Sequence, residues 1–218
     1  MSRPAPLWRW GDPVGPLSEL LARGGVLAIP TESSYGLAAD PGNRKGIETI
    51  YRIKERETGK PLPVVVAGLG QLAGLGIDPD LPILEPLSAC WPGPLTVVLP
   101  TARQLPAAAG TGTLAVRVPE HPRLRDLLAA LGTGLTATSA NRSGAEPILE
   151  PAAAAGLLAG EDAMVVDGGV LTGGPPSTLV AIEETGAVVL RSGRFPVERL
   201  RELLDRPQTA AAHGRRSS

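Results

Sequence analysis

A run of cations between Arg44 and Lys60 is the part of the sequence best suited to bind a small anion. It holds six cationic and three acidic side chains, and the three lysines of the chain all fall within it. Helical spacing predicts that Lys54 lies almost beneath Ile47 on an apolar helix face, so its ammonium must snorkel to the surface or meet a buried anion. Lys54, Arg56 and Lys60 also suit a second interpretation, in which compact and forked donors converge on phosphates.

Hydroxyl and amide groups gather in two turns. The residues from Pro30 to Leu37, PTESSYGL, directly follow an apolar run that predicts a strand, and ligands of α/β sheets tend to bind at strand ends. The second turn carries Thr138, Ser139 and Asn141. Ordinary capping and Ser/Thr turn hydrogen bonds would also explain both segments, because these residue types favour them.

Arg117 interrupts an apolar run that predicts a strand. Its guanidinium must therefore face solvent, pair internally or line a cleft, and a carboxylate is the best partner for its forked donors. Ser177 stands at the start of another predicted strand, and Arg191 at the end of a third. Taken singly, each of these polar positions is a weak indication of a site.

Length and composition restrict the possible functions. A chain of 218 residues with 43% apolar residues can bury the core of one domain. The net charge of −1 and the aromatic content of 3% argue against a nucleic-acid surface built on basic charge and base stacking. The single cysteine and the lack of a signal peptide favour a cytoplasmic protein, and no apolar run is long enough for a membrane span. His121, His213 and Cys90 are too few for a His/Cys metal cluster.

Apolar runs rich in β-branched residues alternate with segments of helical spacing. The runs predict strands at 26–29, 64–66, 95–99, 114–118, 164–166, 178–182 and 188–190. The helical spacing predicts helices around 17–21, 47–51, 124–131 and 200–204. Asp78-Pro79 and His121-Pro122 are typical of helix starts. The pattern indicates an α/β protein with one mixed sheet in a single domain.

Seven motifs follow one another between residues 30 and 193. They are Pro-Thr-Glu-x-x-Tyr-Gly-Leu at 30–37, Lys54-x-Arg56, WPGPLT at 91–96, Arg117-Val118-Pro119, Ser139-Ala140-Asn141 with Ser143-Gly144, Ser177-Thr178 and Arg191-x-Gly193. In this order the sequence resembles the YrdC-like family of L-threonylcarbamoyladenylate synthases. The resemblance covers residues 17 to 205 and implies a twisted, open mixed α/β sheet with flanking helices and a concave basic cleft.

The expected organisation is a YrdC-like domain at 15–205 between two short terminal segments. Residues 1–14 are expected to be an N-terminal extension. Residues 206–218 are polar and Ala-rich and lack apolar periodicity, which predicts a mobile tail.

The resemblance also implies an activity. A nucleotidyltransferase of this family converts L-threonine, bicarbonate and ATP to threonylcarbamoyl-AMP and pyrophosphate, the first step of N6-threonylcarbamoyladenosine modification at adenosine 37 of tRNA. Downstream tRNA threonylcarbamoyltransferase proteins are the implied partners. Carried over by position, the residues implied to hold L-threonine are Thr31, Arg117, Ser139 and Ser177. Those implied to hold ATP are Lys54, Arg56, Thr113, Asn141 and Arg191.

The expected catalysis is electrostatic. Lys54 and Arg56 are the expected catalytic residues, and no covalent nucleophile is required. Mg²⁺ is expected on the triphosphate rather than on protein ligands alone, with Glu32 as a candidate outer partner. The first motif departs from the family pattern at Ser33 and Ser34, which leaves these two hydroxyls without an assigned contact.

Two other functions stay open at the level of sequence. Family members have also been regarded as binders of double-stranded RNA, and a paralogue could make another carbamoyl-adenylate. The net charge of −1 and the scarcity of aromatic residues favour a small anionic ligand over RNA. ATP turnover that threonine does not stimulate would indicate the paralogue.

Overall fold

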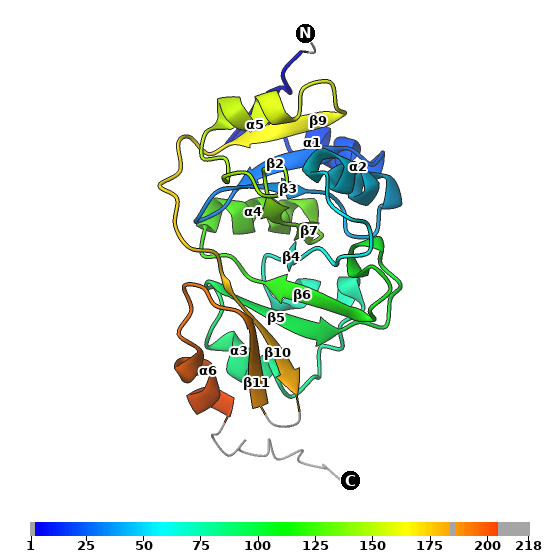
Figure 1. The fold of residues 1–218 in the computed structure, drawn as a ribbon. Coiled ribbons are helices and arrows are strands. Elements are labelled where there is room, and N and C mark those ends of the chain that lie inside the picture. Colours follow the sequence, from blue (N-terminus) through cyan, green and yellow to red (C-terminus); the bar gives the residue numbers. More distant parts are fainter. Residues whose placement is uncertain (1–2, 184–185, 205–218) are drawn as a thin grey trace.

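The structure is a computed structural model, and it describes residues 3–183 and 186–204. Within these residues the strands form two mixed sheets, one above the other in Figure 1, with helices around them. The α/β class expected from the sequence is confirmed, but the single sheet is wrong. Local apolar patterns identify strands, whereas the partner of each strand depends on contacts between distant segments.

The upper sheet of Figure 1 has the strand order β1-β9-β2-β3-β8. β1 and β2 pair in parallel with β9, and β3 pairs antiparallel with β2 and β8. All of β2 is buried, as expected for an apolar strand covered on both faces. The bounds are β1 Leu7–Arg9, β2 Val26–Pro30, β3 Tyr35–Ala38, β8 Thr138–Ser139 and β9 Ala163–Asp167.

The lower sheet has the order β11-β10-β5-β6-β4-β7. Parallel pairs join β10 to β5 and β4 to β6, and the other neighbours pair antiparallel. In β6 the side chains alternate between buried and half-buried positions, which places Arg117 on the less buried face. The bounds are β4 Val64–Val65, β5 Leu95–Pro100, β6 Thr113–Arg117, β7 Leu135–Thr136, β10 Thr178–Glu183 and β11 Gly186–Arg191.

Six α-helices and three short 3₁₀ helices lie among the described residues. The α-helices are α1 Gly15–Ala22, α2 Arg44–Lys54, α3 Leu84–Ser88, α4 Pro122–Leu131, α5 Pro151–Leu157 and α6 Val197–Leu204. The 3₁₀ helices are η1 Leu69–Gln71, η2 Ala73–Leu75 and η3 Pro106–Ala108.

One of the two predicted helix starts is confirmed and the other is wrong. His121 caps α4, because its Nδ1 accepts a hydrogen bond from the Leu124 amide at 3.2 Å. Asp78 instead belongs to a turn, where its carboxylate accepts from the amide of Asp80, and α3 begins at Leu84. An Asp-Pro pair serves turns as readily as helices, since Asp can bond its own backbone two residues on.

Helix α2 carries the cation run to the interior. Asn43 caps its start by accepting from the Gly46 amide at 3.3 Å. Its buried face includes Ile47, Ile50 and, in the last turn, Lys54, as helical spacing predicted. Glu55 follows with φ 50°, and this left-handed residue ends the helix.

A single residue separates strand pairing in the two sheets. Thr136 ends β7 in the lower sheet, Thr138 begins β8 in the upper sheet, and Ala137 lies between them. The Ala137 amide donates to the Pro63 carbonyl at 2.8 Å. Thr136 exchanges two hydrogen bonds of 2.9 Å with the backbone of Ala39. The chain also passes between the sheets through residues 39–63 and through residues 168–177, which run down the left side of Figure 1.

The two ends of the chain differ in what the structure describes. Residues 7–9, within the expected N-terminal extension, form β1, and Trp8 is buried with 7% of its surface exposed. The expected mobile tail at 206–218 lies outside the described residues. None of the helices in the described ranges combines the length and the apolar character needed to cross a membrane.

Candidate functional site

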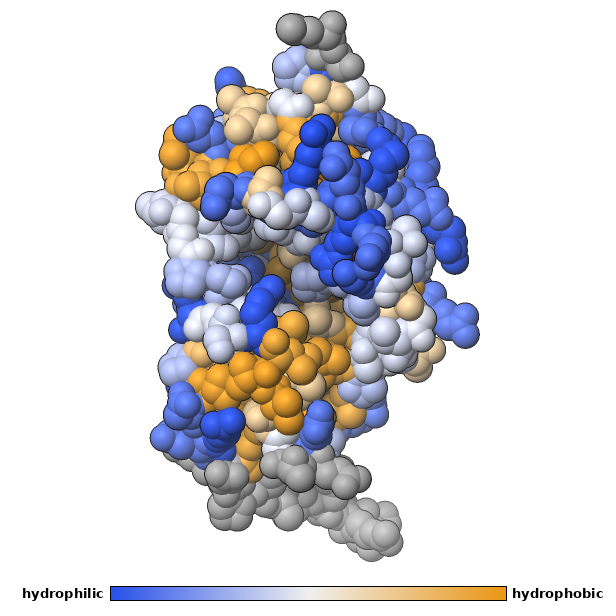
Figure 2. All heavy atoms as spheres, viewed as in Figure 1, coloured by the Kyte–Doolittle hydropathy of each residue, from blue (hydrophilic) through white to orange (hydrophobic). Residues whose placement is uncertain are grey.

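A cavity of about 1130 Å³ lies between the two sheets. Figure 2 shows a recess between the upper and lower halves of the molecule, with apolar residues gathered over the lower half. The three cations on which the predicted site depends, Lys54, Arg56 and Arg117, line this one cavity. All nine residues expected to hold ATP or threonine line it: Thr31, Lys54, Arg56, Thr113, Arg117, Ser139, Asn141, Ser177 and Arg191.

Lys54 is buried, with 4% of its surface exposed, and its ammonium is held by the turn after β8. Nζ donates to the carbonyls of Ser139 at 2.5 Å and Asn141 at 3.1 Å, and to Asn141 Oδ1 at 2.9 Å. An ammonium has three N–H groups, so these three oxygens can accept all of them. The ammonium therefore neither reaches the surface nor is left free of protein contacts; it is bound by oxygens of the chain.

The turn at 139–145 is fastened to Lys54 in a second way. The Lys54 carbonyl accepts from the amide and the hydroxyl of Ser143, both at 2.9 Å. Within the turn, Ser139 Oγ donates to Asn141 Oδ1 at 2.6 Å, and Asn141 Nδ2 donates to the Ala145 carbonyl at 2.5 Å. The Ser-x-Asn motif and the Lys-x-Arg motif, far apart in sequence, therefore form one hydrogen-bonded unit.

The electrostatics of this unit favour an anion. Burial, with the nearby Arg56 charge, lowers the pKa of Lys54 from 10.5 to about 8. The Arg56 guanidinium makes one long hydrogen bond, 3.5 Å, to the Pro61 carbonyl. A phosphate placed near Lys54 and Arg56 would relieve their mutual repulsion and raise the pKa of Lys54.

Thr31 organises the hydroxyl turn between β2 and β3. Its Oγ1 donates to the Ser34 carbonyl at 2.7 Å and accepts from the Ser34 amide at 3.3 Å. Thr31 and Ser34 are buried, and both line the cavity together with Ser33. The local Ser/Thr turn and the cavity-lining position, two interpretations of this segment, are both observed.

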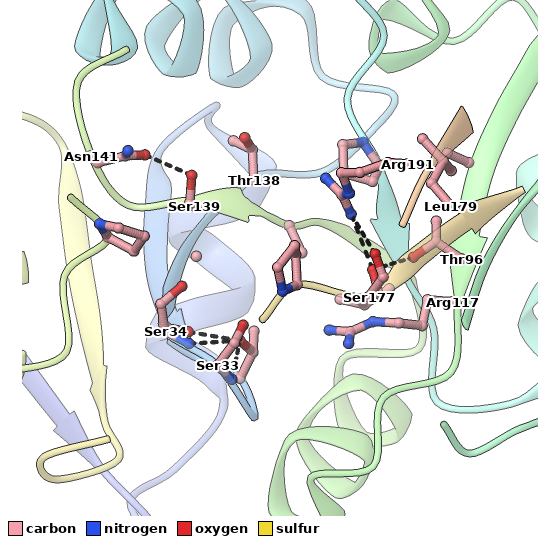
Figure 3. Close-up of a pocket in the computed structure, with 18 of the residues that line it drawn as sticks. Ser33, Ser34, Thr96, Arg117, Thr138, Ser139, Asn141, Ser177, Leu179 and Arg191 are labelled. Atoms are coloured by element: carbon pink, nitrogen blue, oxygen red, sulfur yellow. Dashed lines mark hydrogen bonds between the residues drawn. The ribbon is translucent and has the colours of Figure 1, made fainter. Parts of the chain in front are cut away.

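Ser177 and Arg191 form a second polar group on the lower sheet (Figure 3). Ser177 Oγ lies 2.7 Å from Thr96 Oγ1, and Arg191 Nη2 donates to Ser177 Oγ at 3.2 Å and to its carbonyl at 3.0 Å. Burial, together with the charge of Arg117, lowers the pKa of Arg191 below its ordinary value. Arg117 and Arg191 are therefore two like charges at the same wall of the cavity.

Arg117 both pairs internally and lines the cavity. Its Nη1 lies 3.1 Å from Glu32 Oε2, and the two side chains are each 11% exposed. Figure 3 shows its guanidinium pointing from the lower sheet toward the hydroxyl turn that carries Ser33 and Ser34. A guanidinium has five N–H donors, so the contact with Glu32 leaves donors for a second carboxylate.

Glu32 lies behind Arg117 rather than in the cavity lining. Oε1 accepts from the amide of Glu120 and, at 3.2 Å, from the amide of His121. Burial opposes ionisation of this carboxyl, but the Arg117 charge and the backbone donors outweigh it, and the pKa of Glu32 is lowered. The described contacts of this carboxylate are with Arg117 and with the backbone between β6 and α4.

The cavity has further lining residues that the sequence did not single out. Thr96 bonds Ser177, and its only sequence signal was its place at the end of the WPGPLT motif. Five cations and a single carboxylate, Glu146, are among the lining side chains. An apolar part of the lining comes from the lower sheet, through Val98, Ala115, Leu179 and Leu190. Within the described residues no group of three or more His, Cys, Asp or Glu side chains could hold a metal ion.

Comparison with known proteins decides the family. The Sua5/YciO/YrdC family model, described as "Telomere recombination", matches residues 19–193. The chain belongs to this family. The resemblance to the YrdC-like family seen in the seven motifs is thereby confirmed.

Two relatives in sequence are threonylcarbamoyl-AMP synthases. A threonylcarbamoyl-AMP synthase of Thiobacillus denitrificans is 38% identical over 180 residues, which cover 79% of this chain and 92% of that protein. The Bacillus subtilis threonylcarbamoyl-AMP synthase is 33% identical over 197 residues, which cover 88% of this chain and 57% of that longer protein.

Two solved structures have the same fold. The crystal structure of P. abyssi Sua5 complexed with L-threonine matches with a TM-score of 0.79 at 28% identity, over 92% of this chain and 61% of that one. E. coli YciO matches with a TM-score of 0.75 at 25% identity, over 92% of this chain and all of that one. This family contains members both of the present length and longer.

Proposed function

We propose that this chain is an L-threonylcarbamoyladenylate synthase, a nucleotidyltransferase that makes threonylcarbamoyl-AMP and pyrophosphate from L-threonine, bicarbonate and ATP. The observation that carries the proposal is that two kinds of anion donor share one cavity. Arg117 and Ser177 offer a fork and a hydroxyl suited to a carboxylate, and Arg56 with the Lys54 unit offers positive charge suited to phosphates. The names of the relatives and the L-threonine complex of P. abyssi Sua5 support it.

The reaction requires orientation and charge stabilisation rather than a covalent nucleophile. The neutral threonine amine attacks CO₂ or bicarbonate to form a carbamate, with release of a proton in the case of CO₂ and of water in the case of bicarbonate. A carbamate oxygen then attacks the α-phosphorus, and pyrophosphate leaves. Three anionic groups must approach one another, so positive charge in a confined site is the main contribution that the protein can make.

The described contacts suggest how the residues share this work. Arg56 has donors free of short protein contacts, so it is the proposed direct ligand of the phosphates. Lys54 contributes its charge and holds Ser139 and Asn141 in the cavity wall, and it reaches a phosphate only by exchanging one of its three bonds. Thr113 and Arg191 complete the proposed ATP residues, and Thr31, Arg117, Ser139 and Ser177 are the proposed threonine residues.

The nucleotide and its metal fit the remaining lining. The apolar face of the lower sheet suits an adenine ring, which needs flat apolar contact. Mg²⁺ is proposed to arrive bound to the triphosphate, because this hard cation binds phosphate oxygens readily and the lining offers only Glu146 as a carboxylate. We also propose a cytoplasmic location and transfer of the product to tRNA threonylcarbamoyltransferase proteins.

Pyrophosphate release measured with each substrate omitted in turn tests the function. The proposal expects release that needs ATP, threonine and bicarbonate together. Release without threonine would indicate a paralogue that makes another carbamoyl-adenylate. Binding of duplex RNA with no threonine-dependent release would indicate a binding module, and either result would refute the proposal.

Single substitutions test the two anion sites separately. Arg56→Ala and Lys54→Ala are expected to lower turnover about 100-fold or more, the usual effect of removing a charge-stabilising group. Arg117→Ala is expected to raise the threonine KM while the ATP KM changes little. Near-native turnover of both cavity variants at saturating ATP, or an unchanged threonine KM in Arg117→Ala, would contradict the assignment.

A further inference from the structure

Glu32 is a buried carboxylate that the proposed reaction does not use. It lies in the hydroxyl turn after β2, next to Thr31, and its side chain is 11% exposed. Oε2 is buried and accepts no aligned hydrogen bond from the described residues, although Arg117 Nη1 lies at 3.1 Å. A buried carboxylate oxygen is costly unless it serves as the counter-charge of a fixed cation.

The ion pair between Glu32 and Arg117 joins the two sheets. Glu32 follows a strand of the upper sheet, and Arg117 is the last residue of β6 in the lower sheet. The other carboxylate oxygen of Glu32 accepts from the amides of Glu120 and His121, where the chain leaves β6 for α4. One side chain thus fixes the end of β6 and the guanidinium that β6 carries.

The same network reaches the third segment of the proposed threonine site. The Glu120 carboxylate pairs with Arg194 at 3.2 Å, and the Arg194 amide donates to the Pro176 carbonyl at 3.0 Å, one residue before Ser177. Thr31, Arg117 and Ser177 come from three separate parts of the chain. Glu32 lies next to the first, contacts the second and is linked to the third through Glu120.

Arg117 also needs a fixed counter-charge for electrostatic reasons. Arg191 stands at the same wall, and the like charges of the two guanidinium groups repel each other. Without Glu32, Arg117 would be free to turn away from Arg191 toward solvent. A guanidinium already held in place loses less rotational freedom when it binds a carboxylate.

We propose that Glu32 is a positioning residue for the amino-acid end of the cavity, holding the Arg117 guanidinium so that its remaining donors receive the substrate carboxylate. The inference rests on the proposed function, because it assumes that Arg117 binds that carboxylate. It adds a residue outside the cavity lining that sets the affinity for the amino acid rather than for the nucleotide.

The test compares Glu32→Gln with a matched control. Gln keeps an oxygen for the two amides but removes the charge that holds Arg117. The control is Glu161→Gln, which breaks the Arg52–Glu161 ion pair, neither member of which lines the cavity. Glu32→Gln is expected to raise the threonine KM about tenfold, the change produced by losing about 1.4 kcal/mol of binding, while the ATP KM stays within about twofold. Glu161→Gln is expected to change neither.

A double variant shows whether Glu32 acts through Arg117. The threonine KM of Glu32→Gln/Arg117→Ala is expected to equal that of Arg117→Ala alone, because the two residues form one unit. Additive effects, equal rises in both KM values, or an unchanged threonine KM in Glu32→Gln would overturn the inference. An unchanged threonine KM in Arg117→Ala would instead overturn the proposed carboxylate site.

A second variant covers the case in which Glu32→Gln does not fold, as judged by thermal unfolding. Glu32→Asp keeps the charge but withdraws it by one methylene. It is expected to raise the threonine KM by less than Arg117→Ala does and to leave the ATP KM unchanged. A wild-type threonine KM in a folded Glu32→Asp variant would count against the positioning role.

Discussion

Lys54 shows how a single residue can serve structure and charge together. Its backbone carbonyl and its ammonium both hold the turn at 139–145, so loss of the side chain leaves the Asn141 carbonyl without a donor from the described residues and removes one of the donors to the Ser139 carbonyl. Each buried polar group left unpaired costs about 1–3 kcal/mol. The catalytic effect of Lys54→Ala therefore has to be judged beside its effect on stability.

The titration of Lys54 can be followed directly. We expect a midpoint at a pH of about 8 in ¹³Cε NMR, because burial and the Arg56 charge disfavour the ammonium. Arg56→Ala removes the second cause and should move the midpoint to higher pH. A midpoint near 10.5 in the wild type, or no upward shift in Arg56→Ala, would contradict the described environment.

The lowered pKa of Lys54 also makes the free energy of unfolding depend on pH. The folded pKa of Lys54 is lowered, so between about pH 8 and 10.5 the unfolded chain binds more protons than the folded one. The Lys54 contribution to the free energy of unfolding therefore rises with pH across this window. Below pH 8 both states are protonated, and the contribution no longer changes.

At the scale of elements, the approach of residues 192–195 to the start of β10 fixes both Ser177 and Arg191. Gly193 makes this approach possible, because a Cβ there would collide with the Pro176 carbonyl and the backbone of Ser177 and Thr178. Thr178 Oγ1 then exchanges hydrogen bonds of 2.8 and 3.0 Å with the backbone of Phe195.

Substitution of Gly193 tests how much this close backbone contact contributes to the free energy of unfolding. Gly193→Ala is expected to lower the free energy of unfolding by about 1–3 kcal/mol, as overpacking does. Gly156→Ala is the matched control, since nothing lies within 4 Å of a Cβ there and the site is in α5. The control should gain up to about 1 kcal/mol from helix propensity. Urea unfolding distinguishes the two, and equal stabilities would refute the close contact.

Some elements could be predicted from sequence and others could not. Apolar runs rich in β-branched residues, such as Leu95–Leu99, correctly predicted strands. The apolar spacing of α2 correctly predicted that Lys54 lies on its buried face. β1, at Leu7–Arg9, is only three residues long, and β3 contains Gly36, so neither has a strand signature. α5 is an alanine run after a proline, without apolar periodicity.

The sequence predicted which residues line the cavity better than it predicted which of them contact one another. The nine residues assigned to ATP and threonine from the order of the motifs all line one cavity. The bond between Lys54 and the 139–141 turn, and the pairing of Arg117 with Glu32, join residues 85 positions or more apart. Residue types could restrict the partners of Arg117 to solvent, an internal acid or a ligand, but only the fold chooses among them.

At the scale of the whole molecule, the cavity depends on both sheets. Threonine together with an ATP analogue that cannot be cleaved between the α- and β-phosphates should slow amide exchange at residues 31–34, 117–121 and 139–145. Amides in the pairing of β1 with β9, which contribute nothing to the lining, should be unaffected. Hydrogen–deuterium exchange followed by mass spectrometry measures both regions, and protection confined to one sheet would contradict a shared site.

Ala137 is the shortest link between the two sheets. It is the one residue between β7 and β8, and hydrogen bonds to Pro63 and Ala39 hold the backbone of Thr136 and Ala137. The two sheets are therefore held close together at this point. Relative movement of the two sheets should therefore be smallest at this link and larger along the longer connections. Gly173, Gly174 and Pro176 line the cavity within the long connection from β9 to β10, and we expect substrates to arrive and the adenylate to depart past this segment.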